Sequence, residues 1–170
     1  HYFYENDLLG DDLVVVAPDH SSVGRARKFA ELLHAEWAVV DRRVDNLASN
    51  KSYAVTGNVT GKRAILVDDI IDTGTSMVVA SEALVAAGVT KIYAVAPHAV
   101  FSDQATNRLI ESAIQQVIIT NTIEVPVAKQ FGKLIQISVA SPFAETIRRV
   151  NAFESIEDIM KSPDNLDVML

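Results

Sequence analysis

Short apolar runs alternate with helical patterns along most of the chain. Apolar runs of strand length predict buried strands at Leu13–Ala17, Trp37–Val40, Tyr53–Val55, Arg63–Val67, Lys91–Ala96, Gln116–Thr120 and Leu134–Ser138. Apolar or small residues at helical spacing predict helices at Ser22–His34, Thr75–Ala87, Asp103–Ser112 and Pro142–Asn151. The polar and irregular segment Asp41–Ser52 is expected to be a loop.

The alternation of strands and helices predicts an α/β fold with a mostly parallel central sheet flanked by helices. Continuous apolar strands are typical of parallel sheets that are covered on both faces. Ligands bind such sheets at the carboxyl ends of the strands, so chemistry-bearing residues are sought there. A length of 170 residues fits one domain.

Composition excludes several classes of protein. Hydrophobic residues make up 49% of the chain, which is enough for a core and too many for a disordered protein. No apolar stretch reaches the roughly 18 residues of a membrane span, and no signal peptide pattern is present. The formal net charge of −7 argues against a nucleic-acid partner, which needs basic surface. Without cysteine there is no disulfide framework, and a cytoplasmic location is the expectation.

The most informative segment is residues 64–76, in which a buried strand runs directly into polar residues. The strand is followed by two adjacent acids and then by a third acid, three hydroxyls and a glycine: Asp68, Asp69, Asp72, Thr73, Gly74, Thr75 and Ser76. A helical pattern begins at the end of this segment. The arrangement places donors and acceptors together at the end of a strand.

These residue types suit a phosphorylated sugar. A helix start offers unpaired N–H groups and partial positive charge to a phosphate, and Gly74 lets the backbone turn tightly beside a ligand. Asp68 and Asp69 are acceptors for ribose hydroxyls or for hydrated Mg²⁺. In the alternative, Asp72 or Thr73 only caps the helix, but capping leaves the two acids at the strand end unexplained.

The segment resembles the 5-phosphoribosyl-1-diphosphate (PRPP) binding motif of the type I phosphoribosyltransferase fold. The resemblance implies that Asp68 and Asp69 engage the ribose hydroxyls and that Asp72–Ser76 hold the 5-phosphate. Four further stretches resemble the ribose-phosphate pyrophosphokinase (PRPP synthetase) family in the same order: residues 14–28, 96–102, 117–123 and 137–149. The likeness extends over about residues 10 to 160 and is more specific than the shared motif alone.

The family resemblance implies a reaction and a set of ligands. The reaction transfers the diphosphoryl group of ATP to the 1-hydroxyl of ribose 5-phosphate with Mg²⁺, which gives PRPP and AMP. Asp19 matches the family acid that helps to bind the metal and the ribose end. Arg42 aligns with the catalytic lysine of the family and is expected to be the remaining catalytic cation.

Two departures from the family pattern weaken this expectation for the chemistry. Ser21 and Ser22 replace a glycine pair, and added β-carbons restrict the backbone conformation of that loop. Val44 replaces a second catalytic cation of the family. Because phosphoryl transfer depends on charge neutralisation, each lost cation is expected to be costly. The motif is therefore stronger evidence for the ligand that is bound than for the reaction that is catalysed.

The resemblance also implies that this chain is one half of a longer protein. The family has two similar halves, and the chain corresponds to the C-terminal half, with the end of the first half or a linker at residues 1–10, a phosphoribosyltransferase-like domain at 11–160 and a tail at 161–170. A start at His1 rather than methionine suggests a truncated or cleaved piece, which we expect to be inactive alone. The family also implies homo-oligomers, with dimers that assemble further into a hexamer.

Two other hypotheses stay open at this point. The loop departures are compatible with a catalytically weak paralogue, a regulatory subunit that keeps the sugar-phosphate site. A free-standing phosphoribosyltransferase that uses PRPP as a donor shares the same motif. The absence of an obvious hood over a base site, together with the collinear likeness to the synthetases, argues against the transferase.

Overall fold

The computed structural model describes residues 2–6, 8–44, 51–157 and 159 of the chain, without the side chains of residues 42–44 and 51–52. Its central sheet has seven strands in the order β3-β2-β1-β4-β6-β8-β9. The strands are β1 Leu13–Ala17, β2 Glu36–Val44, β3 Lys51–Thr56, β4 Arg63–Val67, β6 Lys91–Ala96, β8 Ile114–Thr120 and β9 Leu134–Ile137. All neighbouring pairs are parallel except β2 with β3, so the predicted mostly parallel α/β sheet is confirmed.

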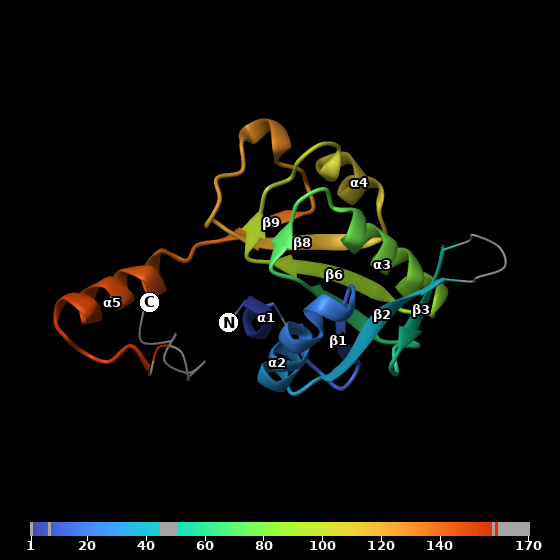
Figure 1. The fold of residues 1–170 in the computed structure, drawn as a ribbon, viewed down its shortest axis with the longest axis horizontal. Coiled ribbons are helices and arrows are strands. Elements are labelled where there is room, and N and C mark those ends of the chain that lie inside the picture. Colours follow the sequence, from blue (N-terminus) through green and yellow to red (C-terminus); the bar gives the residue numbers. More distant parts are fainter. Residues whose placement is uncertain (1, 7, 45–50, 158, 160–170) are drawn as a thin grey trace.

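Helices cover both faces of the sheet (Figure 1). The longer helices near the sheet are α2 Val23–Leu33 and α3 Thr75–Ala86. The shorter elements are α1 Tyr2–Glu5, α4 Ala105–Glu111, the 3₁₀ turns η1 His20–Ser22 and η2 Val127–Lys129, and a small second sheet of β5 Ile70–Ile71 with β7 His98–Ala99. Among the described residues, no helix combines the length and the apolar character that crossing a membrane requires.

Two apolar cores lie on opposite faces of the sheet. Alternate residues of β1 enter different cores: Val14 and Val16 pack on the face covered by α3 and α4, whereas Leu13 and Val15 pack on the face covered by α2. All five residues of β1 are buried. This burial on both faces explains why the strand is a continuous apolar run rather than an alternating one.

The prediction of a loop at Asp41–Ser52 is wrong at both ends of that segment. The strand β2 continues to Val44 and β3 begins at Lys51, and the two strands pair antiparallel, with Asp41 opposite Ala54 and Val44 opposite Lys51. The hairpin lies at the edge of the sheet, where polar strands are common because one side is open to solvent. Each strand of the hairpin forms its hydrogen bonds with the other strand, so the polar residues of the segment alone did not indicate that the strands extend this far.

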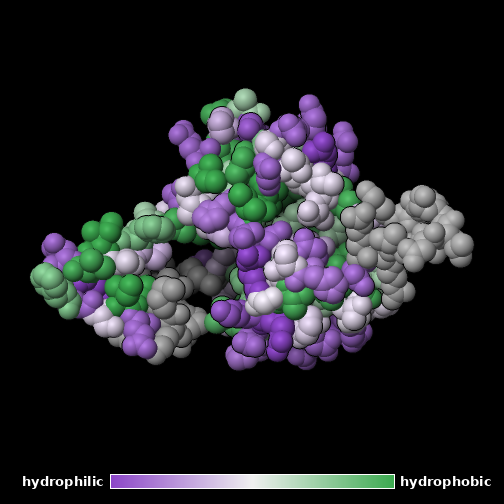
Figure 2. All heavy atoms as spheres, viewed as in Figure 1, coloured by the Kyte–Doolittle hydropathy of each residue, from purple (hydrophilic) through white to green (hydrophobic). Residues whose placement is uncertain are grey.

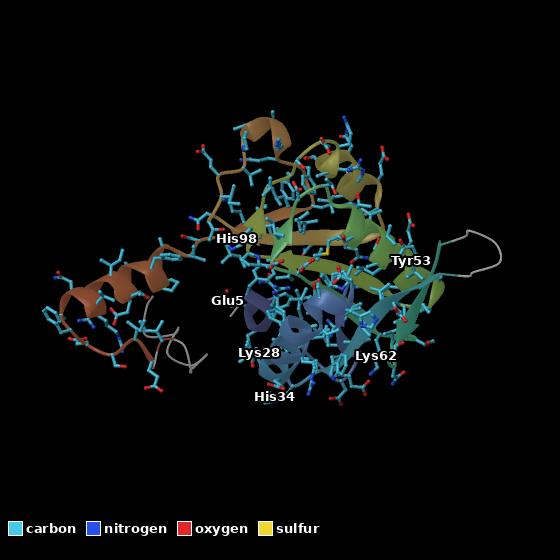
Figure 3. The ribbon with its side chains drawn as sticks, in the orientation of Figure 1. Glu5, Lys28, His34, Tyr53, Lys62 and His98 are labelled. Carbon is cyan, nitrogen blue, oxygen red and sulfur yellow. The ribbon has the colours of Figure 1, made fainter. Side chains whose placement is uncertain are left out.

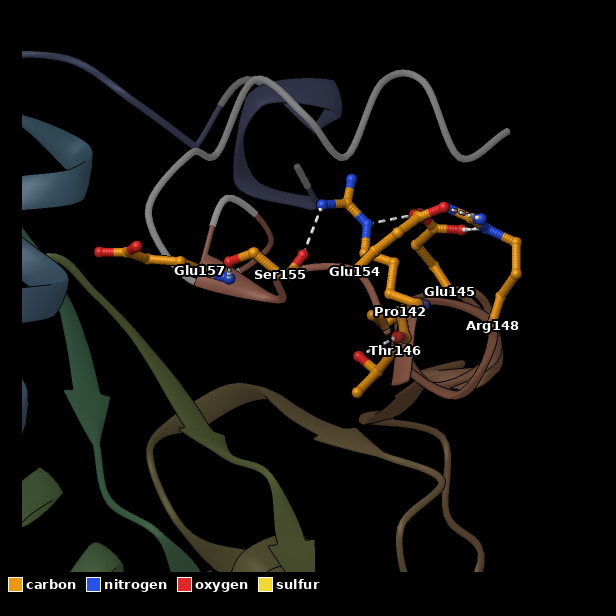
Figure 4. A network of polar contacts seen from close by, with 8 residues as sticks. Pro142, Glu145, Thr146, Arg148, Glu154, Ser155 and Glu157 are labelled. Atoms are coloured by element: carbon orange, nitrogen blue, oxygen red, sulfur yellow. Dashed lines mark hydrogen bonds and ion pairs between the residues drawn. The ribbon is translucent and has the colours of Figure 1, made fainter. Parts of the chain in front are cut away.

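The helix α5, Ala140–Asn151, stands away from the body of the molecule at the left of Figure 1. It has no buried residue, and apolar side chains such as Phe143 and Ile147 are exposed on it (Figure 2). Charged side chains organise its C-terminal end, as the close view shows (Figure 4). Glu145 accepts hydrogen bonds from Arg148 at 2.8 Å and from Arg149 at 2.7 Å. These cations also suit the negative end of the helix dipole.

The ion pairs of α5 predict a pH dependence. Hydrogen bonds from Arg148, followed by those from Arg149, lower the pKa of Glu145 to about 2. Because this pKa is depressed on folding, the pairs stabilise the helix above the unfolded pKa of about 4.3. Their contribution is lost as the pH falls through 2. We expect the Glu145 carboxyl, followed by NMR, to titrate well below the other exposed glutamates; a midpoint near 4.3 would contradict the pairing.

The turn after β3 predicts a strongly destabilising substitution. Gly57 has a φ of 131°, and an added Cβ would lie 2.6 Å from the Cβ of Ala38 on the neighbouring strand. The Gly57→Ala variant should therefore lose about 1–3 kcal/mol of unfolding free energy in urea titrations. Gly132→Ala is the matched control, because Gly132 faces open space without a positive φ, and it should be neutral or slightly stabilising. Equal stability of the two variants would refute this account.

Candidate functional site

The parallel pairing of β1 with β4 brings two predicted acids to one edge of the sheet. The register places Val16 opposite Leu66, so both strands end side by side. Asp19 follows the end of β1, and Asp68 follows the end of β4. The two acids are linked by Ser22, whose hydroxyl oxygen lies 2.8 Å from Oδ1 of Asp68 and 3.5 Å from Oδ1 of Asp19.

Asp19 is held by the turn that follows it. It caps η1, and its Oδ1 accepts hydrogen bonds from the Ser21 N–H at 2.8 Å and from the Ser22 N–H at 3.3 Å. Partial burial raises the pKa of Asp19, but the hydrogen bonds from the two serines together outweigh it and leave the pKa below its usual value. Asp19 therefore carries a negative charge at neutral pH. Ser21 and Ser22 thus hold this carboxylate in place.

Asp68 and Asp69 form an adjacent pair that is bridged by a cation. One guanidinium nitrogen of Arg25 lies 2.9 Å from Oδ1 of Asp68, and another lies 2.8 Å from Oδ2 of Asp69. Asp68 is the more buried acid, with 16% of its side chain exposed against 54% for Asp69. Burial raises the pKa of Asp68 and the neighbouring Asp69 carboxylate adds to the rise, while the Ser22 hydroxyl opposes it.

The segment Asp72–Ser76 leads into α3 without a side-chain cap. Gly74 is the N-cap residue with a φ of 75°, and no side chain caps the helix there. The Asp72 carboxylate instead accepts a hydrogen bond from the Ser102 hydroxyl. The hydroxyls of Thr73 and Thr75 lie 3.2 Å apart. Neither Asp72 nor Thr73 therefore caps α3 with its side chain.

An uncapped helix start has donors to offer. The first N–H groups of an α-helix have no partner within the helix, and the dipole makes this end partially positive. Arg108 of α4 supports the segment by donating to the carbonyl oxygen of Thr73 at 2.8 Å. Gly74 faces the backbone of α4, with an added Cβ 3.5 Å from the Ala105 carbonyl oxygen. A phosphate can be held here by backbone N–H groups and hydroxyls.

A cavity of about 380 Å³ lies beside this helix start. Its wall joins the turn after β1, the hairpin and the start of α3, and its lining residues are Pro18, Asp19, His20, Val40, Asp41, Tyr53, Thr75, Ser76 and Val79. The cavity thus brings together three of the predicted site residues. Asp68 and Asp69 are not in its lining; Asp68 is linked to the lining residue Asp19 through the Ser22 hydroxyl.

Arg42, the expected catalytic cation, lies on β2 next to the cavity-lining Asp41. Its backbone pairs with Tyr53, which Figure 3 labels on β3. The Arg42 side chain falls outside the described part of the structure. On the hairpin side of the cavity, His20 Nε2 lies 3.0 Å from Oδ1 of Asp41, so the turn after β1 contacts the strand that carries Arg42.

Two residues that matter to this site were not predicted as site residues: Arg25 was overlooked, and Ser22 was noted only as a departure from the family pattern. A signal was present, since both lie at the start of the helix that follows Asp19, three residues apart and hence on one face. His98, labelled in Figure 3, lies on β7, and its Nδ1 is 2.9 Å from the hydroxyl oxygen of Thr122 in the turn after β8.

The carboxylates also permit a test of fit for Mg²⁺. No group of three acidic or histidine side chains among the described residues is arranged to hold a metal ion. Mg²⁺, however, is commonly held by one or two carboxylates together with waters and substrate phosphates. All hydrogen bonds that described residues donate to Asp19 reach Oδ1, which leaves Oδ2 as a ligand atom. The site therefore fits a metal that arrives with a phosphate-bearing substrate.

Comparison with known proteins identifies the family. A model of the phosphoribosyl synthetase-associated domain matches residues 44–161. A ribose-phosphate pyrophosphokinase from Caldanaerobacter subterraneus is 47% identical over 158 residues, which are 93% of this chain and 50% of the relative. A ribose-phosphate pyrophosphokinase 1 from Listeria monocytogenes is 43% identical over 160 residues, with 94% and 50% covered. The chain spans about half the length of the curated relatives it matches.

Solved structures agree with this result. The phosphoribosylpyrophosphate synthetase from Mycobacterium smegmatis matches with a TM-score of 0.77 and 37% identity, over 84% of this chain and 46% of that protein. An APRTase from Giardia lamblia, at 12% identity and a TM-score of 0.51 over 81% of this chain and 74% of that protein, shows the shared type I phosphoribosyltransferase-like fold alone. From the family model and these relatives, the chain belongs to the ribose-phosphate pyrophosphokinase family.

Proposed function

We propose that the chain is the ribose 5-phosphate-binding, C-terminal half of a ribose-phosphate diphosphokinase, which makes PRPP and AMP from ATP and ribose 5-phosphate. The observation that carries the proposal is the uncapped start of α3 beside a bridged pair of carboxylates. An anion-binding helix start and a pair of hydroxyl acceptors are the two features that recognition of a sugar phosphate requires. Family membership and the identity to named relatives point to the same reaction.

In this proposal each predicted residue has a defined task. The hydroxyls and N–H groups of Asp72–Ser76 bind the 5-phosphate, and Asp68 and Asp69 accept hydrogen bonds from the ribose hydroxyls. This binding orients the 1-hydroxyl toward the β-phosphorus of ATP. The new bond forms between that oxygen and the β-phosphorus, the bond to the α-phosphate oxygen breaks, AMP leaves, and the hydroxyl proton is released.

Charge neutralisation is the second requirement of the reaction. Mg²⁺, held by Asp19 and the substrate phosphates, would supply positive charge to the diphosphoryl group. Arg42, from the hairpin beside the cavity, would supply a further cation, because guanidinium binds phosphate oxygens well. The rest of the ATP site is assigned to the half of the family's length that this chain does not span, so we expect these 170 residues alone to be inactive.

A regulatory paralogue is the competing function, and one observation favours it. The serines at positions 21 and 22 are both engaged with Asp19 rather than leaving an open glycine turn. Such a protein would bind ribose 5-phosphate without turning it over. The assays below separate the two functions.

The activity test uses the full gene product. AMP formation from ATP and ribose 5-phosphate with Mg²⁺ should be detected, and Arg42→Ala should lower kcat by about 100-fold because it removes a cation from the transition state. Arg43→Ala is the matched control, because it removes the same charge at the neighbouring position in the sequence, and its effect should be much smaller. Ribose 5-phosphate binding without AMP formation would select the regulatory function, and base-dependent pyrophosphate release from PRPP would select a transferase.

The phosphate placement has its own test. Asp72→Ala should weaken ribose 5-phosphate binding by about tenfold or more in calorimetric titrations, because it removes the hydrogen bond that ties the segment before α3 to Ser102. Ser102→Ala removes the same hydrogen bond from the other side and should also weaken binding. A dissociation constant that Asp72→Ala leaves unchanged would refute the placement of the phosphate.

A further inference from the structure

One cation connects three parts of the site. Arg25 extends from the first turns of α2 and places one guanidinium nitrogen on each of two adjacent carboxylates, at 2.9 Å from Asp68 and 2.8 Å from Asp69. Ser22, one turn earlier, donates to Asp68 as well. The helix that follows Asp19 is thereby tied to the end of β4. Neither composition nor the acidic motif indicated this connection.

Without a cation, this acid pair is an unfavourable arrangement. Two neighbouring carboxylates repel one another, and Asp68 is also largely removed from solvent. A planar guanidinium can contact both acids at once in a fixed geometry, which an ammonium cannot do equally well. Arg25 is therefore positioned to offset the repulsion between the two carboxylates and to fix how they are oriented relative to each other.

Among the side-chain contacts of the described residues, one oxygen of each acid takes no part in the bridge. The contacts of Asp68 with Arg25, Ser22 and the Asp69 N–H all use Oδ1. The contact of Asp69 with Arg25 uses Oδ2. The two remaining oxygens are acceptors on adjacent residues. They suit a ligand with two hydroxyl donors on adjacent carbons, because each donor can then reach its own acceptor.

We infer that Arg25 is a positioning residue for sugar recognition, which holds Asp68 and Asp69 as a joint acceptor for the vicinal hydroxyls of ribose 5-phosphate and so sets the preference over the 2-deoxy sugar. The inference rests on the proposed function, because it takes ribose 5-phosphate as the ligand. Arg25 acts through the two acids and does not itself contact the sugar. Its removal should alter which sugar is bound more than whether phosphate is bound.

The experiment compares three ligands with the full gene product: ribose 5-phosphate, 2-deoxyribose 5-phosphate and inorganic phosphate. The wild-type protein should bind ribose 5-phosphate about tenfold or more tighter than the deoxy sugar, because one hydrogen bond to a charged acceptor is lost. In Arg25→Met this ratio should fall toward one, while the affinity for inorganic phosphate changes by less than about twofold. Arg25→Lys should restore part of the ratio, since it returns the charge without the planar fork.

A matched control lies on the same helix. The Arg27 guanidinium sits 5.6 Å from the centre of the Trp37 ring and contacts neither acid, so Arg27→Met changes the charge of α2 by the same amount. It should keep the wild-type ratio. Steady-state kinetics add a second readout: Arg25→Met should raise the KM for ribose 5-phosphate and leave the KM for ATP unchanged.

The outcomes separate the inference from the proposed function. A wild-type protein that binds none of the sugar phosphates would overturn the proposed function. A wild-type protein that discriminates, together with Arg25→Met that discriminates equally well, would overturn the inference alone and make Arg25 a structural link. Thermal unfolding shows whether Arg25→Met folds. If it does not, Arg25→Lys decides between the two roles. A positioning role predicts that this variant prefers ribose 5-phosphate over the deoxy sugar less strongly than the wild type, whereas a purely structural link predicts an unchanged preference.

Discussion

The parallel pairing of β1 with β4 is the constraint on which the site depends. Both strands are buried on two faces, and their register is fixed because a slip by one residue would exchange the residues of the two cores. That register ends the strands side by side and lets the Ser22 hydroxyl reach both Asp19 and Asp68. Packing of the two cores therefore sets the positions of Asp19 and Asp68, which lie in short turns directly after the two strands.

Charge at this edge of the sheet is arranged so that an acidic protein can bind an anion. The chain carries a net charge of −7, and carboxylates gather at the site itself. Arg25 offsets part of the charge of the acid pair, Arg108 supports the segment before α3, and the helix start adds partial positive charge. A small anion needs only local donors, which is why the net charge argues against a nucleic-acid partner without arguing against a sugar phosphate.

The sequence predicted the parts of the fold whose signals are local. Apolar runs located the buried strands closely, and the acid–hydroxyl–glycine segment located the start of α3, because burial on two faces and helix starts both leave patterns in neighbouring residues. The extension of β2 to Val44 was missed, since its hydrogen bonds come from β3 across the hairpin. Arg25 was missed for the same reason: an exposed arginine on a helix gains its meaning only from Asp68 and Asp69, more than forty residues away.

The residues proposed for binding and the residue proposed for catalysis therefore lie on parts of the sheet that are held by different numbers of buried contacts. Asp68 follows the end of β4, beside the end of β1, and it contacts both Ser22 and Arg25. Arg42 lies on an edge hairpin, whose link to the turn after β1 includes the exposed contact between His20 and Asp41. An edge hairpin opens at lower cost than a central strand, because fewer buried contacts hold it.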